Sequence, residues 1–273
     1  MGAHTSVMSR QIGAVDVLYQ PSGGACSRPR AALAELDAAG IAVALVSQCK
    51  QWSCERQWMC VDTRLEDVAR FMRESVRFAG LAGYNPFDAT ESLREMEAAR
   101  ALGFRGSYVH AASFGVRLGD ARLYPLFAKS AELAQPAVLQ LPLGEPDVAR
   151  CTARICQDFP ELSLALVHPR PTAEMLALGE RFERLAYVVD TETLAWMCRH
   201  EREVLDDARQ VERCLWGSNG APLSETTHAA LGLELPPATL ESILRSNALR
   251  YFAATPPSQK PQALSEEVVA AER

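Results

Sequence analysis

Eight short apolar runs recur along the chain, and each is followed by a polar or helix-like stretch. Several runs, such as Ile41–Val46 and Leu162–Val167, are continuous rather than alternating. Strands that are apolar on both faces are typical of a parallel sheet covered by helices. The eight runs are Ile12–Tyr19, Ile41–Gln48, Phe78–Tyr84, Gly106–His110, Ala137–Leu141, Leu162–His168, Leu185–Asp190 and Arg213–Gly217.

Helical periodicity fills several of the segments between the runs. The first such segment, Ala31–Ala39, ends at Gly40, which is a suitable C-cap. Asp88 and Glu91 give another segment an acidic helix start. Further helices are predicted over Leu65–Val76, Ala89–Leu102, Leu123–Ala134 and Thr239–Arg250.

The repeated strand–helix unit predicts an α/β protein that is a single (β/α)8 barrel. Such a barrel typically takes about 250 residues, and the chain has 273. We place the barrel at residues 12–253, after an N-terminal arm at 1–11. A C-terminal tail at 254–273 is rich in Pro at its start and acidic towards its end.

Composition and motifs exclude several classes of function. The net charge of −6 gives no support for nucleic-acid binding, which usually leaves a basic face. No apolar run approaches the roughly 18 residues of a membrane helix, and the polar start lacks a signal core. The chain contains neither a G-x-G-x-x-G motif nor a G-x-x-x-x-G-K-[ST] loop. We expect a cytoplasmic protein that binds no membrane and no nucleotide cofactor.

The eight cysteines favour reduced thiols in the cytoplasm over disulfides. Cys49, Cys54 and Cys60 are clustered, but no paired C-x-x-C accompanies them. Ordinary thiols are therefore favoured over a zinc site at this cluster.

The strand ends are the positions to search, because a barrel carries its chemistry at the C-terminal ends of its strands. Here these ends are rich in amides and poor in ionisable groups. The candidates are Asp16, Leu18, Gln20, Ser47, Gln48, Cys49, Tyr84, Asn85, His110, Gln140, His168, Asp190, Glu192, Ser218 and Asn219.

Several strings resemble one known family, in order and in spacing. They are Phe78–Pro86, Leu102–Gly106 followed by His110, Arg122–Leu133, Phe159–Leu162 leading to His168, Leu215–Pro222, and the closing Asn247–Phe252. The chain resembles the amidohydrolase-related family that includes aminocarboxymuconate-semialdehyde and resorcylate decarboxylases and pyrone-dicarboxylate lactonases. The matching sequence segments cover most of the chain from Phe78 to Phe252.

The resemblance implies a divalent metal, but the expected ligands are missing. The family usually binds metal through a His-x-His pair on strand one, a His on strand five and an Asp on strand eight. Those positions fall on Leu18, Gln20, Gln140 and Asn219; only the assisting strand-six histidine, His168, matches. Amides are weak ligands and Leu is none. We predict no tightly bound catalytic metal and no other cofactor.

The remaining polar residues suggest how a metal-free site would work. His168 is a candidate general acid or base, or a structural histidine kept from an ancestor. Asn219 and Gln140 are predicted to orient a carbonyl or carboxylate, with Gln20 beside them in a packing role. The three amides could equally be hydrogen-bonded to one another and fill the former metal cavity. Asp190 is a candidate general base, although a helix cap is more common.

Further substrate contacts are predicted at His110, Tyr84 and Trp52. His110 would bind a carboxylate, or else cap a helix. Tyr19 should point away from the face of Leu18 by strand alternation. Trp52 lies in an apolar loop after strand two, which suggests either a lid over the barrel or a dimer contact. We expect a homodimer.

Three functions stay open at this point. The first is a metal-independent enzyme acting on a small aromatic or carboxylated compound, by lyase, decarboxylase, cyclase or lactone-hydrolase chemistry. The second is a catalytically inactive relative that binds a small molecule or regulates an active partner. The third, ranked last, is a hydrolase with a relocated metal held by His110, His168 and Asp190.

Overall fold

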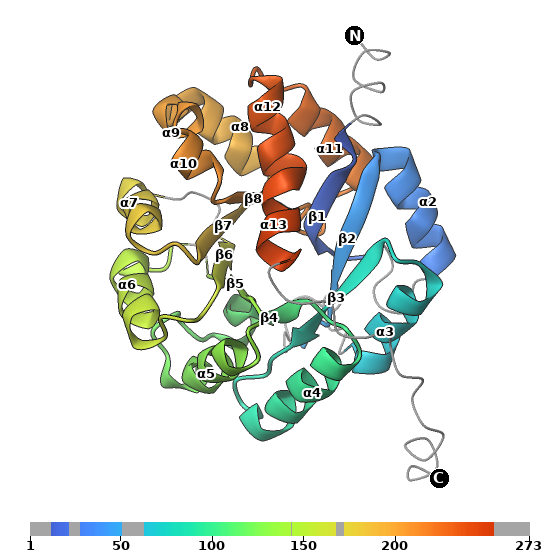
Figure 1. Cartoon of the computed structure of the whole chain (residues 1–273), viewed down its shortest axis with the longest axis vertical. Helices are drawn as coiled ribbons and strands as arrows, with labels where there is room; N and C mark the ends of the chain where they lie inside the picture. The colour runs from blue at the N-terminus through green and yellow to red at the C-terminus, as the bar shows by residue number, and fades with distance from the viewer. Residues whose placement is uncertain (1–11, 22–27, 51–62, 143, 168–171, 254–273) are drawn as a thin grey trace.

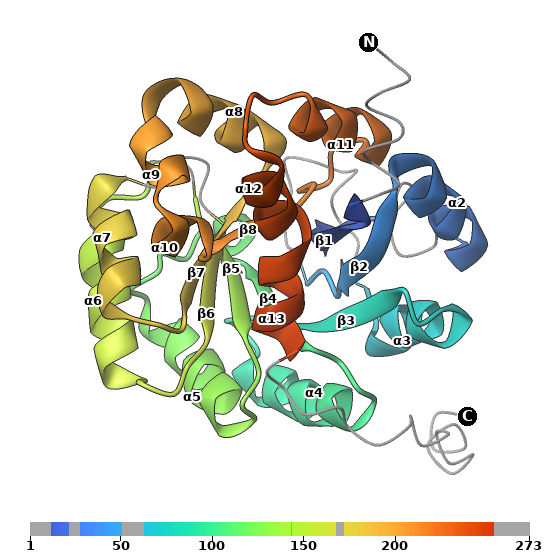
Figure 2. The same cartoon turned by 45° about the horizontal axis from the view of Figure 1, so that its top comes forward.

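A computed structural model describes residues 12–21, 28–50, 63–142, 144–167 and 172–253. Within these ranges the chain is a single (β/α)8 barrel: a central sheet surrounded by helices (Figures 1 and 2). The predicted fold is therefore confirmed. The arm at 1–11 and the tail at 254–273 lie outside the described residues, so those two boundaries stay predictions.

All eight predicted strands are present, each within two residues of its expected start and end. They are β1 (Ala14–Tyr19), β2 (Ile41–Ser47), β3 (Phe78–Gly83), β4 (Gly106–His110), β5 (Ala137–Gln140), β6 (Leu164–Val167), β7 (Leu185–Val189) and β8 (Cys214–Trp216). Consecutive strands pair in parallel from β1 to β8. The sheet ladder has a seam, because β8 lies beside β1 without forming a ladder with it.

The helices pack on the outside of the sheet. The main ones are α2 (Pro29–Ala39), α3 (Leu65–Glu74), α4 (Ala89–Ala101), α5 (Tyr124–Glu132), α6 (Val148–Asp158), α7 (Ala173–Arg181), α8 (Thr191–His200) and α11 (Leu223–Leu231); shorter ones are α9 (Arg202–Asp206) and α10 (Ala208–Val211). Two predicted end signals are confirmed. Gly40 caps α2 in the left-handed region with φ 69°, and the Asp88 side chain accepts from the Glu91 N–H at the start of α4.

Two apolar clusters divide the core. One lies between the sheet and the helices, and the other fills the barrel interior with residues such as Leu18, Leu45 and Leu215. At the end of β1, Tyr19 belongs to the outer cluster while Leu18 belongs to the inner one. The predicted orientation of Tyr19, away from the face of Leu18, is confirmed.

The last helical segment closes the N-terminal end of the barrel. It was predicted as one helix, Thr239–Arg250, but it comprises α12 (Pro237–Glu241), a π-helical turn at Ser242–Ser246 and α13 (Asn247–Ala253). Asn247 donates to the carbonyl oxygens of Val211 and Cys214 at the start of β8. Figure 1 shows α13 crossing in front of the strands. The opposite, C-terminal end of the strands is left for the site.

Among the described residues, no helix is long and apolar enough to cross a bilayer.

Candidate functional site

Three polar side chains from distant parts of the sequence form a hydrogen-bonded chain at the C-terminal side of the barrel. The Tyr108 hydroxyl of β4 donates to Gln140 Oε1 at 2.6 Å, and Gln140 Nε2 donates to Asn219 Oδ1 at 3.0 Å. Gln140 is the last residue of β5, and Asn219 follows β8. The structure therefore brings together two of the amides that the sequence placed in the site. We call Tyr108, Gln140 and Asn219 the amide chain.

The tyrosine proton fixes the direction of the amide chain. Tyr108 is 1% exposed, and this burial raises the pKa of its phenol well above the usual value. The phenol is therefore neutral, and its single O–H donates a hydrogen bond to Gln140 Oε1. Gln140 must then turn its N–H towards Asn219, which must accept through its oxygen. The chain consequently ends in the Asn219 NH2 group, which is a hydrogen-bond donor.

Asn219 sits in a turn that suits its residue type. Its φ is 51° and the φ of Gly220 is 78°, so both residues lie in the left-handed region. Asn is enriched there among residues other than glycine. A Cβ on Gly220 would lie 3.2 Å from Gln20 Oε1, which shows that the Gln20 side chain packs beside the same turn. Whether Gln20 contacts substrate or only packs there stays a prediction.

The inner wall next to the amide chain is also neutral. Cys49 follows β2 and packs against the interior cluster, and burial raises the pKa of its thiol to about 11. Leu18 is fully buried in the same cluster. The thiol and the Tyr108 phenol both keep their protons at neutral pH, because each pKa lies well above 7.

Comparison with known families identifies the barrel. A family model described as amidohydrolase matches residues 6–253. The chain belongs to the amidohydrolase family. The resemblance read from the sequence is thereby confirmed. No curated protein matches the chain.

Solved structures share the barrel at low sequence identity. An uncharacterized TIM-barrel protein from Bordetella bronchiseptica has a TM-score of 0.68 at 20% identity, covering 92% of this chain and 90% of its own. A 5-carboxyvanillate decarboxylase from Novosphingobium aromaticivorans has a TM-score of 0.59 at 18% identity, covering 83% and 80%. A 2,6-dihydroxybenzoate decarboxylase from Rhizobium has a TM-score of 0.59 at 15% identity, covering 84% and 89%. At these identities the likeness shows a shared fold.

The amidohydrolase metal positions do not fit a divalent ion in this chain. Gln140 and Asn219 direct an N–H and an oxygen at each other, which uses the Asn219 oxygen that a metal would need. Leu18 offers a hydrocarbon, and an amide carries no charge to offset that of an ion. Among the described residues, no group of three or more His, Cys, Asp or Glu side chains is placed to hold a metal.

Two predicted site residues cap helices. Asp190 follows β7, and its Oδ1 accepts from the Thr193 N–H at 2.8 Å at the start of α8. His110 Nδ1 accepts from the Ser113 N–H at 3.0 Å in the short helix Ala111–Phe114. Both residues show the capping alternative that the sequence left open. Their proposed chemical roles stay predictions.

Tyr84 lies in the outer apolar cluster and has no exposed surface. Its hydroxyl donates to the Arg122 carbonyl oxygen at 2.7 Å, which joins the end of β3 to the short 3-10 helix Ala121–Leu123 before α5. The predicted substrate contact at Tyr84 stays a prediction. Trp52 and His168 lie outside the described residues. Val167, the last described residue of β6, belongs to the interior cluster.

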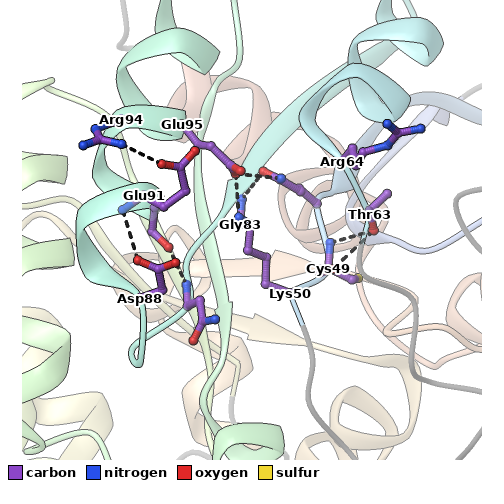
Figure 3. A network of polar contacts seen from close by, with 12 residues as sticks. Cys49, Lys50, Thr63, Arg64, Gly83, Asp88, Glu91, Arg94 and Glu95 are labelled. Atoms are coloured by element: carbon purple, nitrogen blue, oxygen red, sulfur yellow. Dashed lines mark hydrogen bonds and ion pairs between the residues drawn. The ribbon is translucent and has the colours of Figure 1, made fainter. Parts of the chain in front are cut away.

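An ion pair at the end of β2 was not predicted as part of the site. Lys50 Nζ lies 2.8 Å from Glu95 Oε2 on α4, with the two side chains only 14% and 23% exposed. Gln48 Nε2 donates to the same carboxylate, and Gln48 Oε1 accepts from the Gly83 N–H. Figure 3 shows Lys50 and Glu95 meeting beside Gly83. This network holds the ends of β2 and β3 against α4.

Tyr108 was the residue that sequence reasoning missed within the amide chain. The signal was available, because Tyr108 stands two residues before His110 in the same run and so shares its face. Tyr108 lies inside the strand and not at its end, so it is not among the strand-end candidates. The long Tyr108 side chain reaches the mouth of the barrel from two residues before the end of β4.

Proposed function

We propose that this amidohydrolase is an enzyme that works without a divalent metal on a small aromatic or carboxylated compound. The reaction would be of lyase, decarboxylase, cyclase or lactone-hydrolase type. The observation that carries the proposal is the amide chain, which ends in a donor at the C-terminal side of the barrel. That side carries the active site in barrel enzymes.

The donor end of the amide chain suits an oxygen that gains negative charge during a reaction. The Asn219 NH2 group has no hydrogen-bond partner among the described residues and is only partly buried. A donor that is already oriented by neighbours stabilises such an oxygen at little cost in reorganisation. The Tyr108 phenol and Gln140 amide would serve as orienting groups, and Gln20 would line the turn.

The structural neighbours support an aromatic acid as the first class of compound to test. One was solved with manganese and 4-hydroxy-3-methoxy-5-nitrobenzoic acid, and another with 2,6-dihydroxybenzoate. These ligands belong to those proteins. For this chain they define a screening panel: 2,6-dihydroxybenzoate, 4-hydroxy-3-methoxybenzoate, and the corresponding phenols and esters.

In this proposal His168 supplies the acid or base. It directly follows β6 in the sequence, at a strand end where barrel enzymes place such groups. His168→Ala should lower turnover of any panel substrate by roughly 10²–10⁴-fold, the usual contribution of a positioned proton carrier. The thermal unfolding midpoint should stay close to that of the unchanged protein. Turnover followed by chromatography of substrate and product checks this prediction.

The alternative is a catalytically inactive amidohydrolase that binds a small molecule or regulates an active partner. One observation favours it: Gln140 and Asn219 are hydrogen-bonded to each other, which uses a Gln140 N–H and the Asn219 oxygen instead of leaving them for substrate. Panel compounds that bind but are never converted would support this alternative and would contradict the enzymatic proposal. Unchanged turnover in His168→Ala would instead remove His168 from the mechanism.

A further inference from the structure

Asp16 is a buried carboxylate that has no part in the proposed chemistry. It lies in β1 and has no exposed surface. One oxygen, Oδ1, accepts two backbone N–H groups, from Leu18 at 2.9 Å and from Ser218 at 2.9 Å. The other oxygen, Oδ2, has no hydrogen-bond partner among the described residues.

The two N–H groups lie on opposite sides of the barrel seam. Leu18 belongs to β1, and Ser218 follows β8, 202 residues away from Asp16. No ladder joins β8 to β1, so this carboxylate oxygen supplies a link that backbone pairing does not. The Ser218 hydroxyl makes a long contact of 3.5 Å to the Leu18 carbonyl oxygen. Burial raises the pKa of the Asp16 carboxyl, and the Ser218 side chain and the two backbone N–H groups act against that rise. Asp16 therefore holds the chain at the residue just before Asn219.

The approach of the two strands at the seam is close. A Cβ on Gly217 would lie 3.1 Å from Leu18 Cβ and 3.1 Å from Val188 Cγ1, which is tighter than ordinary contact. The chain then turns into the left-handed region at Asn219. The position of the Asn219 amide thus depends on where Ser218 is fixed, and Ser218 is fixed by Asp16.

We infer that Asp16 is a positioning residue, which sets the Asn219 end of the amide chain by accepting the Ser218 N–H across the β1–β8 seam. The role needs one acceptor oxygen. It does not need the second oxygen, which has no partner. The consequence for ligand binding rests on the proposed function, whereas the positioning itself does not.

The conservative variant separates this role from a need for charge. Asp16→Asn keeps the acceptor oxygen and changes only Oδ2 to an NH2 group, whereas Asp16→Ala removes the acceptor. In a ¹H–¹⁵N spectrum, the Asn219 side-chain NH2 signals, assigned by their absence in Asn219→Asp, should stay in place in Asp16→Asn. In Asp16→Ala the Asn219 NH2 signals should move to the chemical shifts of free amides. Ser218→Ala, which keeps the backbone N–H, is the matched control and should resemble the natural protein.

If the Asn219 NH2 signals also moved to free-amide shifts in Asp16→Asn, the inference would be overturned, because charge or the second oxygen would then be required. The same movement of these signals in Ser218→Ala would also overturn the inference, because the Ser218 hydroxyl would then set the position of Asn219. Hydrogen exchange keeps the test decisive if Asp16→Ala does not fold. In the natural protein the Ser218 amide should exchange at least about tenfold more slowly than an unprotected amide. Unprotected exchange would contradict the link. Neither readout uses a substrate, so both are independent of the enzymatic proposal.

Discussion

Trp216→Ala is expected to lower the free energy of unfolding by about 3–5 kcal/mol, the usual cost of removing a large buried aromatic ring. Trp216 ends β8 and is fully buried in the outer cluster. Its Nε1 also donates to Thr191 Oγ1 at 3.1 Å, which ties β8 to the start of α8. Chemical denaturation, with the midpoint compared at constant slope, measures the loss.

Trp216→Phe is the matched control for this prediction. It keeps an aromatic ring in the cluster, and Thr191 keeps its own bond to the Thr226 carbonyl oxygen. We expect the free energy of unfolding of this variant to fall by about 1–2 kcal/mol, clearly less than in Trp216→Ala. Equal losses in the two variants would show that the hydrogen bond, and not ring packing, dominates at this position.

Asn219→Asp is expected to weaken binding of the tightest aromatic acid of the panel on the order of 100-fold. An Asp can still accept from Gln140 through one oxygen, so the amide chain keeps its geometry. The NH2 donor, however, becomes a charged acceptor that repels a carboxylate. Asp also tolerates the left-handed backbone of this turn. Titration calorimetry measures the change in dissociation constant.

Asn219→Gly separates the loss of a donor from the gain of a charge. Glycine accepts the positive φ without strain and removes the whole side chain. We expect an affinity between those of the natural protein and Asn219→Asp. If Asn219→Asp binds the acid as tightly as the natural protein does, the donor end of the amide chain is not where the carboxylate binds.

The fold was readily predicted because its signals are local and repeated. Continuous apolar runs mark strands buried on both faces, and Gly40 in the left-handed region ends α2. The last helical segment was less well predicted. Its π-helical turn at Ser242–Ser246 leaves no distinct mark in the apolar periodicity. The β1–β8 seam is bridged by the Asp16 link across 202 residues, which no local pattern reveals.

The candidate site was only partly predictable from the sequence. Gln140 and Asn219 were placed in it because they occupy positions where the family resemblance expects metal ligands, and the structure joins them directly. Their hydrogen bond could not be predicted, since it depends on side-chain rotamers from two distant strands. Asp190 and His110 have side chains typical of catalytic or substrate-binding residues, yet both accept hydrogen bonds from backbone N–H groups at helix starts.

Charge is the main physical difference between this site and a metal centre. A divalent ion brings two positive charges, which imidazole and carboxylate donors hold in place. The amide chain offers only oriented dipoles, and its phenol stays neutral because burial raises the phenol pKa. Dipoles stabilise an oxygen that gains charge, but they do not activate water as a metal does. Under the proposed function, the reaction would therefore be one that needs only orientation and a proton.

The metal content of the protein tests the central claim most directly. The protein would be purified without chelator, after growth with zinc and manganese, and analysed by mass spectrometry for bound metal per chain. Replacement of the metal ligands by a neutral amide chain predicts a content far below one equivalent. A content near one equivalent of zinc or manganese would contradict the account.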